Sequence, residues 1–477
     1  MRQLFSVVMA FVCWWTLPVR AEPVQSGKLY AGWAQRDLSP KLPAPLAGQR
    51  RLRIARKIRD PLTCTALALE TRDGDKPIDQ VIWLSCDLLA IRGDVAPRLR
   101  QRLRKSLPEV DPLKLIVHAT HTHTSPVLEE GSYDIPKNVL SPREYELFVV
   151  EQAEQAVVQA WKSRAPAAMS WGLGHAVVGH NRRAVFANGK AIMYGPTARK
   201  DFREFEGYED HGVELLFFWD ADKNLTGIVV NVACPAQETE GLSEVSADFW
   251  HETRLALRKE FGDKLFVLPQ CAAAGDISPH LMYRKKAEDR MRQRRGLDRR
   301  QEIARRIARA VTDVFPYCKE ARTSLELAHV TARIDLPVRQ VTKAEYEQAQ
   351  ELLKEWSKPK PGAKWMVNRQ KQIIERYRTQ KEKTTYPVEL HVVRLGEVAL
   401  ATNPFELFLD FGLRMKTRSQ AVMTMTVQLA GYGTYVPTEK AVRGGGYSAE
   451  VASNLVGPKG GQVLVEETVK RINALWE

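Results

Sequence analysis

The residues most suited to chemistry in this chain are three histidines that fall within six positions. His118, His121 and His123 end an apolar run and stand in the sequence His-Ala-Thr-His-Thr-His-Thr-Ser-Pro, although the chain holds only ten histidines in 477 residues. If the run is a strand, side-chain alternation places His121 and His123 on one face and His118 on the other. Zinc favours imidazole nitrogen, so this pair predicts a metal ligand beside a second ligand or a proton-transfer group. The alternative is two histidines packed at a sheet edge.

Three further polar segments follow apolar, strand-like runs. Ser278 lies in Gly-Asp-Ile-Ser-Pro, where a serine nucleophile would need an adjoining base and the alternative is a structural turn. Glu406 ends the segment Asn-Pro-Phe-Glu, and a lone glutamate in a loop is usually solvated. Tyr447 follows three glycines, which let the backbone approach a neighbour closely or adopt a positive φ. Each segment alone is a weak signal of function.

The order and spacing of these segments resemble the catalytic domain of the neutral, non-lysosomal ceramidases, over about residues 31–473. The resemblance rests on segments 120–126, 180–183 and 275–279 and on the positions of Glu406 and Tyr447. It implies a hydrolase with one zinc ion (Zn2+) that cleaves the amide of N-acyl sphingoid bases such as ceramide. It also implies that His121, Glu406 and Tyr447 are three of the four zinc ligands.

The fourth ligand implied by the resemblance does not carry over directly. The family has a histidine in a His-Pro segment, and the matching stretch here places Cys234 before Pro235. A thiolate is a good zinc ligand, so Cys234 is predicted to complete the shell. The alternatives are that Glu238 or Glu240 replaces the histidine, or that Cys234 is a packed core residue and the metal site is weakened.

The resemblance also suggests roles for the remaining residues. Zinc lowers the pKa of a bound water toward ~7 and polarises a carbonyl. This water is the predicted nucleophile, because no general base lies next to Ser278 in the sequence. His123 is the predicted proton shuttle. Arg182 is predicted to stabilise the oxyanion or orient the substrate, with Arg183 an equal candidate. Ser278 would bind the reacting group or build its loop.

Some departures from the family leave the substrate open. Thr124 and Ser125 replace Ser-Gly, Val456 stands where the family has a tyrosine, and the family's C-terminal immunoglobulin-like domain is expected to be absent. The alternatives are therefore a hydrolase of a different amide or ester, or a non-catalytic lipid- or glycan-binding protein with a degraded metal site.

The elements that must position these residues follow an α/β pattern. Helical patterns at 95–107 and 249–261 alternate with strand-like runs. These runs lie at 63–70, 81–86, 113–118, 215–219, 227–232, 265–268, 388–395, 398–402 and 423–429. We therefore expect one large α/β domain over residues 22–477, with a central mixed β-sheet flanked by helices.

Two charged helical segments, 284–312 and 343–383, interrupt this pattern. The net charge of the chain is +14, and residues 284–309 alone contain twelve basic and four acidic residues. A solvated helix face is the favoured interpretation, and an acidic membrane surface is the alternative partner. No aromatic residue interleaves with these arginines, so we expect no nucleic-acid partner. Segment 343–383 resembles a polar helical hairpin, broken at 359–362, that covers the domain.

The first 21 residues are typical of a cleaved signal peptide: a basic start, an apolar stretch from Leu4 to Leu17 and a small-residue cleavage site. We therefore expect a secreted or periplasmic protein. Five cysteines remain after cleavage and none has Cys-x-x-Cys spacing, so a disulfide framework is not predicted. Composition, with 44% hydrophobic and 27% charged residues, excludes a disordered or multi-span membrane chain. The sequence leaves the oligomeric state open.

Overall fold

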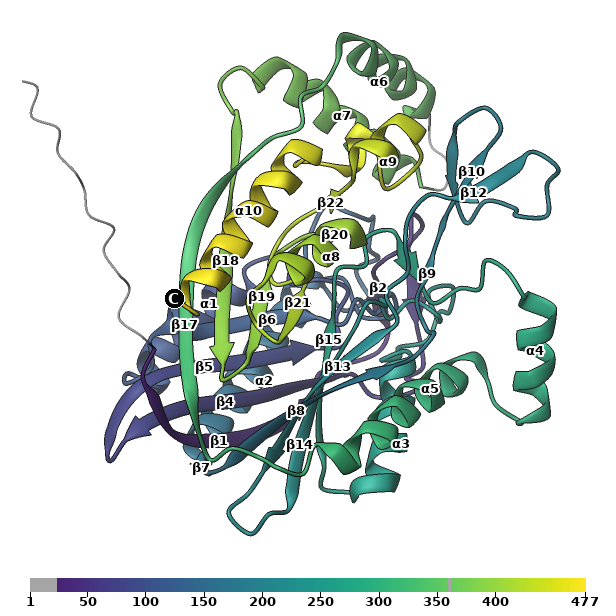
Figure 1. The fold of residues 1–477 in the computed structure, drawn as a ribbon. Helices are drawn as coiled ribbons and strands as arrows, with labels where there is room; N and C mark the ends of the chain where they lie inside the picture. The colour runs from purple at the N-terminus through teal and green to yellow at the C-terminus, as the bar shows by residue number, and fades with distance from the viewer. Residues whose placement is uncertain (1–23, 359–361) are drawn as a thin grey trace, which may run out of the picture.

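The computed structural model describes residues 24–358 and 362–477, so the predicted signal peptide lies outside the described residues. Two β-sheets pack face to face, and helices cover their outer faces (Figure 1). This arrangement confirms the predicted α/β class with a central mixed sheet flanked by helices. It adds a second sheet that the sequence pattern had not separated from the first.

The larger sheet has the strand order β21-β19-β18-β17-β1-β4-β5-β6, with the short strand β7 paired to β1. Most neighbours are antiparallel, whereas β5 with β6 and β19 with β21 run parallel, so the sheet is mixed. Its strands are β1 Ser26–Asp37, β4 Thr63–Asp73, β5 Lys76–Cys86, β6 Leu115–Ala119, β7 Ala165–Pro166, β17 Ser324–Pro337, β18 Thr385–Leu395, β19 Val398–Thr402 and β21 Met423–Val427.

The smaller sheet has the order β15-β14-β13-β8, and its face meets the larger sheet through one apolar cluster. Its strands are β8 Ala168–His175, β13 Gly212–Trp219, β14 Leu225–Val232 and β15 Phe266–Cys271. Alternation along the strands explains the packing: Leu216 and Phe218 of β13 join the inter-sheet cluster, whereas Leu215 and Phe217 face the helices outside. Both faces of β13 are buried, which is why its sequence is a continuous apolar run.

Helices cover the outer faces in three groups. One half of the larger sheet is covered by α1 (Val95–Ser106) and α2 (Pro142–Lys162), and the other half by α8 (Leu409–Arg418) and α10 (Pro458–Ala474). The smaller sheet is covered by α3 (Phe249–Phe261) and α5 (Arg299–Val314). A capping box between Ser141 and Glu144 starts α2.

The predicted polar hairpin is confirmed as α6 (Lys343–Trp356) and α7 (Ala363–Thr379), which pack on a small apolar cluster of their own. The charged helix α4 (Lys285–Arg294) stands apart at the right edge of Figure 1. The remaining elements are short: β2 Ala44–Leu46, β3 Arg53–Ala55, β9 His180–Asn181, β10 Arg183–Phe186, β11 Ala191–Met193, β12 Phe202–Phe205, β16 Ile277–Ser278, β20 Glu406–Leu407, β22 Tyr435–Val436, α9 Glu439–Gly444, and the 3₁₀ turns Pro112–Lys114, Phe315–Tyr317 and Val451–Ser453. Within the described residues, no helix is both long and apolar enough to span a bilayer.

Candidate active site

Loops that follow five strands of the two sheets converge on one place. The parallel pairs β5–β6, β14–β15 and β19–β21 each end with both carboxyl termini at the same edge. Backbone hydrogen bonds then join the loops beyond them. They run from Ala119 N to Leu429 O, from Ala236 N to Thr120 O, from Gln428 N to Cys271 O and from Asn403 N to Val427 O. Segments far apart in the chain therefore meet where the sequence places its polar motifs.

His121 and Glu406 form the centre of this convergence. Strand β6 ends at Ala119, so His121 lies beyond the strand, with φ at +70°, rather than in the alternating pattern expected from the sequence. Its Nδ1 donates to the Leu89 carbonyl at 2.7 Å, and its Nε2 lies 3.2 Å from Glu406 Oε2. Burial alone would raise the pKa of Glu406, but the charge of His121 and hydrogen bonds from His121 and Tyr435 lower it.

Tyr435 is a member of this centre that the sequence analysis missed. It pairs with Glu406 in register between β20 and β22, and burial raises the pKa of its phenol, so the protonated hydroxyl donates to the Glu406 carboxylate. The nearby glycines at 431 and 433, which resemble those before Tyr447, were the available sequence signal. The two tyrosine rings lie 5.8 Å apart, edge to face.

Arg182 connects the Glu406 side of the site to the other polar motifs. Its guanidinium donates to the Tyr435 hydroxyl at 3.2 Å, to the Gly275 carbonyl at 2.9 Å and to Gln237 Oε1 at 3.3 Å. It is 2% exposed, and its Nε has no partner among the described residues. An arginine held in this way keeps one donor for a bound group.

His123 lies beside His121, with the two rings 4.8 Å apart and nearly perpendicular. Gln237, which the sequence analysis did not single out, places its Nε2 3.1 Å from His123 Nε2. Because Gln237 Oε1 faces Arg182, its amide donates to His123, whose Nδ1 then turns toward Glu240 Oε2 at 3.6 Å. Burial and the charges of His121, Arg53 and Arg182 lower the pKa of His123 well below its ordinary value. Burial and these charges therefore favour the neutral imidazole at His123.

Ser278 belongs to the same network, two hydrogen bonds from Arg182. Its Oγ accepts a hydrogen bond from the Tyr194 hydroxyl at 3.1 Å, and Tyr194 lies 3.5 Å from Arg182 Nη1. The backbone N–H of His280 also donates to Ser278 Oγ, and the His280 ring bonds Glu240 Oε1 at 3.0 Å. Within the described part of the chain, the hydrogen-bond partners of Ser278 Oγ are Tyr194 and the His280 backbone, and neither is a base.

At two glycines the backbone approaches residues of the site so closely that no side chain would fit between them. A Cβ at Gly275 would lie 2.3 Å from the Glu406 carbonyl oxygen, so the Gly-Asp turn can approach β20 only without a side chain. Gly48 has φ at +90°, and a Cβ there would lie 2.6 Å from His123 Nδ1. The Gly-Asp turn noted in the sequence therefore needs glycine at position 275 for a steric reason.

Tyr447 lies between this network and the helical hairpin. Its ring stacks at 6.2 Å on Trp365 of α7, and the guanidinium groups of Arg50 and Arg369 lie 5.6 and 5.5 Å from the Tyr447 ring centre. Burial and the Glu406 charge raise the pKa of Tyr447. Helix α7 therefore packs over Tyr447 at the edge of the site. It also contacts loop 131–134 through Lys364 and Asn368.

The structure does not bring Cys234 to this centre. Its Sγ faces the Val178 carbonyl at 3.5 Å, and its side chain, fully buried, packs in the apolar cluster under α3 and α5. Burial, followed by the charges of Cys271 and Asp248, raises the pKa of the Cys234 thiol well above its ordinary value. These contacts are those of a packed core cysteine.

Arg183, the other arginine candidate, also points away from the centre. It is fully buried in a pair with Glu206 and donates to Ser448 Oγ at 3.2 Å and to the Gly445 carbonyl at 2.6 Å. Arg183 therefore anchors the glycine loop that carries Tyr447, whereas Arg182 faces the site.

The side chains present fit a zinc ion in part. No three His, Cys, Asp or Glu side chains of the described chain are arranged to hold a metal. A ligand set of one His, one Glu and one Tyr contains only two residues of these four types, so it can exist without such a group of three. Because Nδ1 donates to Leu89, Nε2 faces the Glu406 carboxylate, where either a second proton, as in the charged ring, or a cation would lie between the two groups. Two tetrahedral zinc ligands lie about 3.4 Å apart, close to this spacing.

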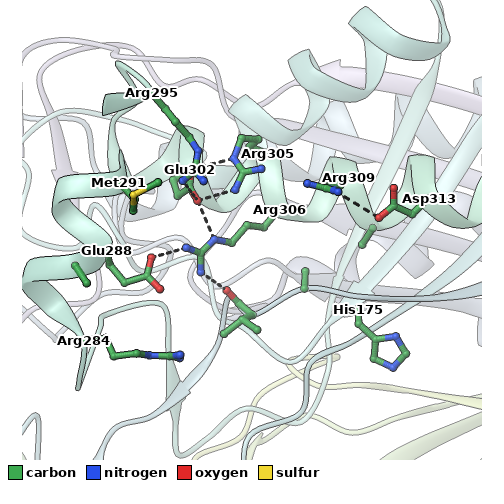
Figure 2. Close-up of a pocket in the computed structure, with 14 residues that line it drawn as sticks. His175, Arg284, Glu288, Met291, Arg295, Glu302, Arg305, Arg306, Arg309 and Asp313 are labelled. Carbon is green, nitrogen blue, oxygen red and sulfur yellow. Dashed lines mark hydrogen bonds and ion pairs between the residues drawn. The ribbon is translucent and has the colours of Figure 1, made fainter. Parts of the chain in front are cut away.

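A small cavity adjoins the site. A cavity of about 50 Å³ is lined by Gly48 and Leu89, next to His123 and His121. Larger hollows lie elsewhere, including one of about 480 Å³ between α4, α5 and the end of β8 (Figure 2). His121 and His123 are 4% and 8% exposed, so bulk water is largely excluded from them.

Comparison with known proteins identifies the fold. No protein-family model matches the chain, and no curated protein matches its sequence. A crystal structure of neutral ceramidase from Pseudomonas aeruginosa superimposes with a TM-score of 0.68 at 16% identity, covering 94% of this chain and 74% of that one. A structure described as ceramidase complexed with C2 gives a TM-score of 0.65 at 14% identity, covering 94% and 75%. The motif resemblance is thus confirmed at the level of fold: this chain has the architecture of the neutral ceramidases.

Proposed function

We propose that this protein is a zinc-dependent hydrolase that cleaves the amide bond of an N-acyl lipid of the ceramide class. The observation that carries the proposal is the buried pair of His121 and Glu406, joined through Tyr435 to Arg182 and flanked by a neutral His123. The neutral ceramidase fold supports the same conclusion.

His121, Glu406 and Tyr447 are the proposed zinc ligands, with Tyr435 holding the Glu406 carboxylate in place. When bound, zinc would lower the pKa of a water molecule and polarise the amide carbonyl. Cys234 has no part in this set, because its Sγ is engaged by the core and the Val178 carbonyl. The fourth position is left to water or substrate, as in catalytic zinc sites with three protein ligands.

The remaining residues divide the other tasks. His123, kept neutral by burial, takes up a proton at Nε2 once Gln237 gives way, and returns it to the leaving amine. The Glu240 carboxylate stabilises the imidazolium that forms. Arg182 offers its unpartnered Nε to the carbonyl oxygen as negative charge develops there. Ser278 and Tyr194 hold Arg182 at this angle.

The test combines metal analysis with hydrolysis of an N-acyl sphingosine. His121→Ala and Glu406→Gln should each lower bound zinc from about one ion per chain toward none, and abolish turnover. His211→Ala is the matched control, because His211 pairs with Glu209 outside the network. Full turnover in a chelator-treated, zinc-free preparation would refute the proposal. A panel of other amides and esters separates ceramide from different substrates.

We also propose that the protein is exported and cleaved after residue 21, on the basis of the N-terminal sequence alone. Amino-terminal sequencing of the exported chain should begin at Glu22. A chain that keeps Met1 and stays in the cytoplasm would contradict this.

A further inference from the structure

Helix α4 carries a dense positive charge and buries none of its residues. Residues 284–295 contain seven basic and two acidic side chains. In Figure 1 the helix stands away from both sheets. A polar helix without a buried face gains nothing from the hydrophobic core, so its charge calls for another explanation.

Most of this charge is not used inside the molecule. Four exposed side chains of α4 make no ion pair or side-chain hydrogen bond within the described part of the chain: Lys285, Lys286, Arg290 and Arg294. What ties the helix to α5 is Glu288, whose carboxylate accepts from Arg306 at 2.5 Å. Glu288 thus faces the protein, whereas the four unpaired cations are exposed.

The hollow beside α4 is also positively charged (Figure 2). Glu302 at its floor accepts hydrogen bonds from three arginines at 2.8 to 3.3 Å. The lining contains five arginines but only three carboxylates: Arg284, Arg295, Arg305, Arg306 and Arg309 against Glu288, Glu302 and Asp313. Among the described residues Arg284 has no carboxylate partner, and its guanidinium contacts the Tyr283 hydroxyl and ring. Met291, 43% exposed, stands on the rim.

We propose that α4 and this hollow form a docking surface for an anionic lipid bilayer. Clusters of four to eight basic side chains adsorb to acidic phospholipid headgroups, and Arg284 and Arg295 present guanidinium groups that suit a phosphate oxygen. Met291 enters the interfacial layer. No aromatic residue lies between 284 and 309 to stack on bases, which favours lipid over nucleic acid.

The docking surface is linked along the chain to the candidate active site. His280, four residues before Arg284, bonds Glu240 at 3.0 Å, so Arg284 lies within about 14 Å of it along the chain. Arg299, at the start of α5, bonds Glu238 at 3.1 Å. Segment 281–298 is thus held at both ends by carboxylates of the loop that also carries Gln237. Docking would bring the headgroup layer beside the site. The value of this position for catalysis rests on the proposed function, whereas the docking itself does not.

The experiment is sedimentation of the full chain with vesicles of phosphatidylcholine alone or mixed 70:30 with phosphatidylglycerol. Wild type should bind the mixed vesicles, less at high salt, and not the neutral ones. The test variant replaces the four free cations: Lys285→Gln, Lys286→Gln, Arg290→Gln and Arg294→Gln. Its affinity for mixed vesicles should fall at least about tenfold. A control of equal charge change, which should bind as wild type does, replaces exposed cations elsewhere: Lys223→Gln, Lys264→Gln, Arg333→Gln and Lys381→Gln.

Three results would overturn the proposal. The first is wild-type vesicle binding by the α4 variant. The second is tighter binding to a duplex oligonucleotide than to the mixed vesicles. The third is displacement from vesicles by millimolar inorganic phosphate at constant ionic strength, which would assign the hollow to a free anion. Binding needs no turnover, so His121→Ala should still bind vesicles, and failure of the proposed function would be seen separately.

Discussion

The role proposed for His123 depends on its surroundings rather than on its residue type. The imidazole is buried against Gly48 and is contacted by Gln237 on one nitrogen and by Glu240 on the other. Burial favours the neutral imidazole, whereas the adjacent Glu240 carboxylate would favour the charged form.

We therefore expect His123→Ala to lower turnover about 100-fold or more while zinc stays bound. The measurement is kcat on an N-acyl sphingosine together with zinc content, with His211→Ala as the control. If zinc and turnover fall in proportion, His123 is a ligand and the assignment as proton shuttle is wrong.

Cys234 is the residue for which sequence and structure point in different directions. The thiol lies in the core with its pKa raised, and its hydrogen bonds within the described chain run to the Val178 and Pro235 carbonyls rather than to His121 or Glu406. We expect Cys234→Ala to keep wild-type zinc affinity and to lower the free energy of unfolding by about 1 kcal/mol, the cost of a small cavity.

Zinc titration and urea unfolding of the Cys234→Ala variant check this prediction. Cys234→His is the complementary variant and should be overpacked, losing about 1–3 kcal/mol. A strong loss of zinc affinity in Cys234→Ala, with stability unchanged, would show that the sulfur reaches the metal.

At the scale of elements, β17 and β18 hold a histidine pair remote from the site. His329 Nε2 lies 2.9 Å from His391 Nδ1, and both side chains are buried. The charged groups packed around the pair are Glu389 on β18, Arg100 on α1, Lys114 on the first 3₁₀ turn and Asp79 on β5. Burial, with the charges of His391 and Lys114, lowers the pKa of His329 well below 6.5.

This lowered pKa makes stability depend on pH. The unfolded chain binds a proton at His329 near pH 6.5, whereas the folded chain does not until a lower pH. The stabilising contribution is therefore present above about pH 6.5 and is lost as the pH falls, by up to about 1.4 kcal/mol per pH unit. Urea unfolding between pH 7 and pH 5 should show a steeper loss for wild type than for His329→Gln. Equal slopes would mean that His329 titrates normally in the fold.

At the scale of the whole molecule, a buried ion pair joins the two sheets. Arg254 of α3, which covers the smaller sheet, donates two hydrogen bonds, at 2.8 and 3.0 Å, to Asp87, directly after β5 of the larger sheet. Asp87 also accepts from the backbone and side chain of Thr63. The pair thus fixes how the strand ends that carry the site face each other.

Arg254→Ala should lower the free energy of unfolding by about 3–5 kcal/mol, because it leaves the Asp87 carboxylate buried without its partner. Arg309→Ala, which removes an exposed pair with Asp313, should cost no more than about 1 kcal/mol. Thermal and urea unfolding measure both. If the two variants lose the same stability, the buried pair does not join the sheets as described.

Local sequence was sufficient to predict most strands and the chemical segments. Runs such as those of β13, β14 and β19 are apolar and end in polar loops, and parallel neighbours bring such loops to one edge. That is why His121, Arg182, Ser278 and Glu406, chosen from separate segments, lie in one network. Helix α2 was overlooked, although its Ser-x-x-Glu capping box is written in the sequence.

Tertiary structure alone decided which side chains of those loops face inward. A shift of one residue turns a side chain to the opposite face, so Cys234 falls into the core while Gln237, three positions later, reaches His123. Tyr435 meets Glu406 only through the pairing of β20 with β22, and the second sheet becomes distinct only when β13 packs across the first. The period of a sequence pattern predicts whether a residue is buried, whereas the partner it meets depends on contacts between segments that are distant in the chain.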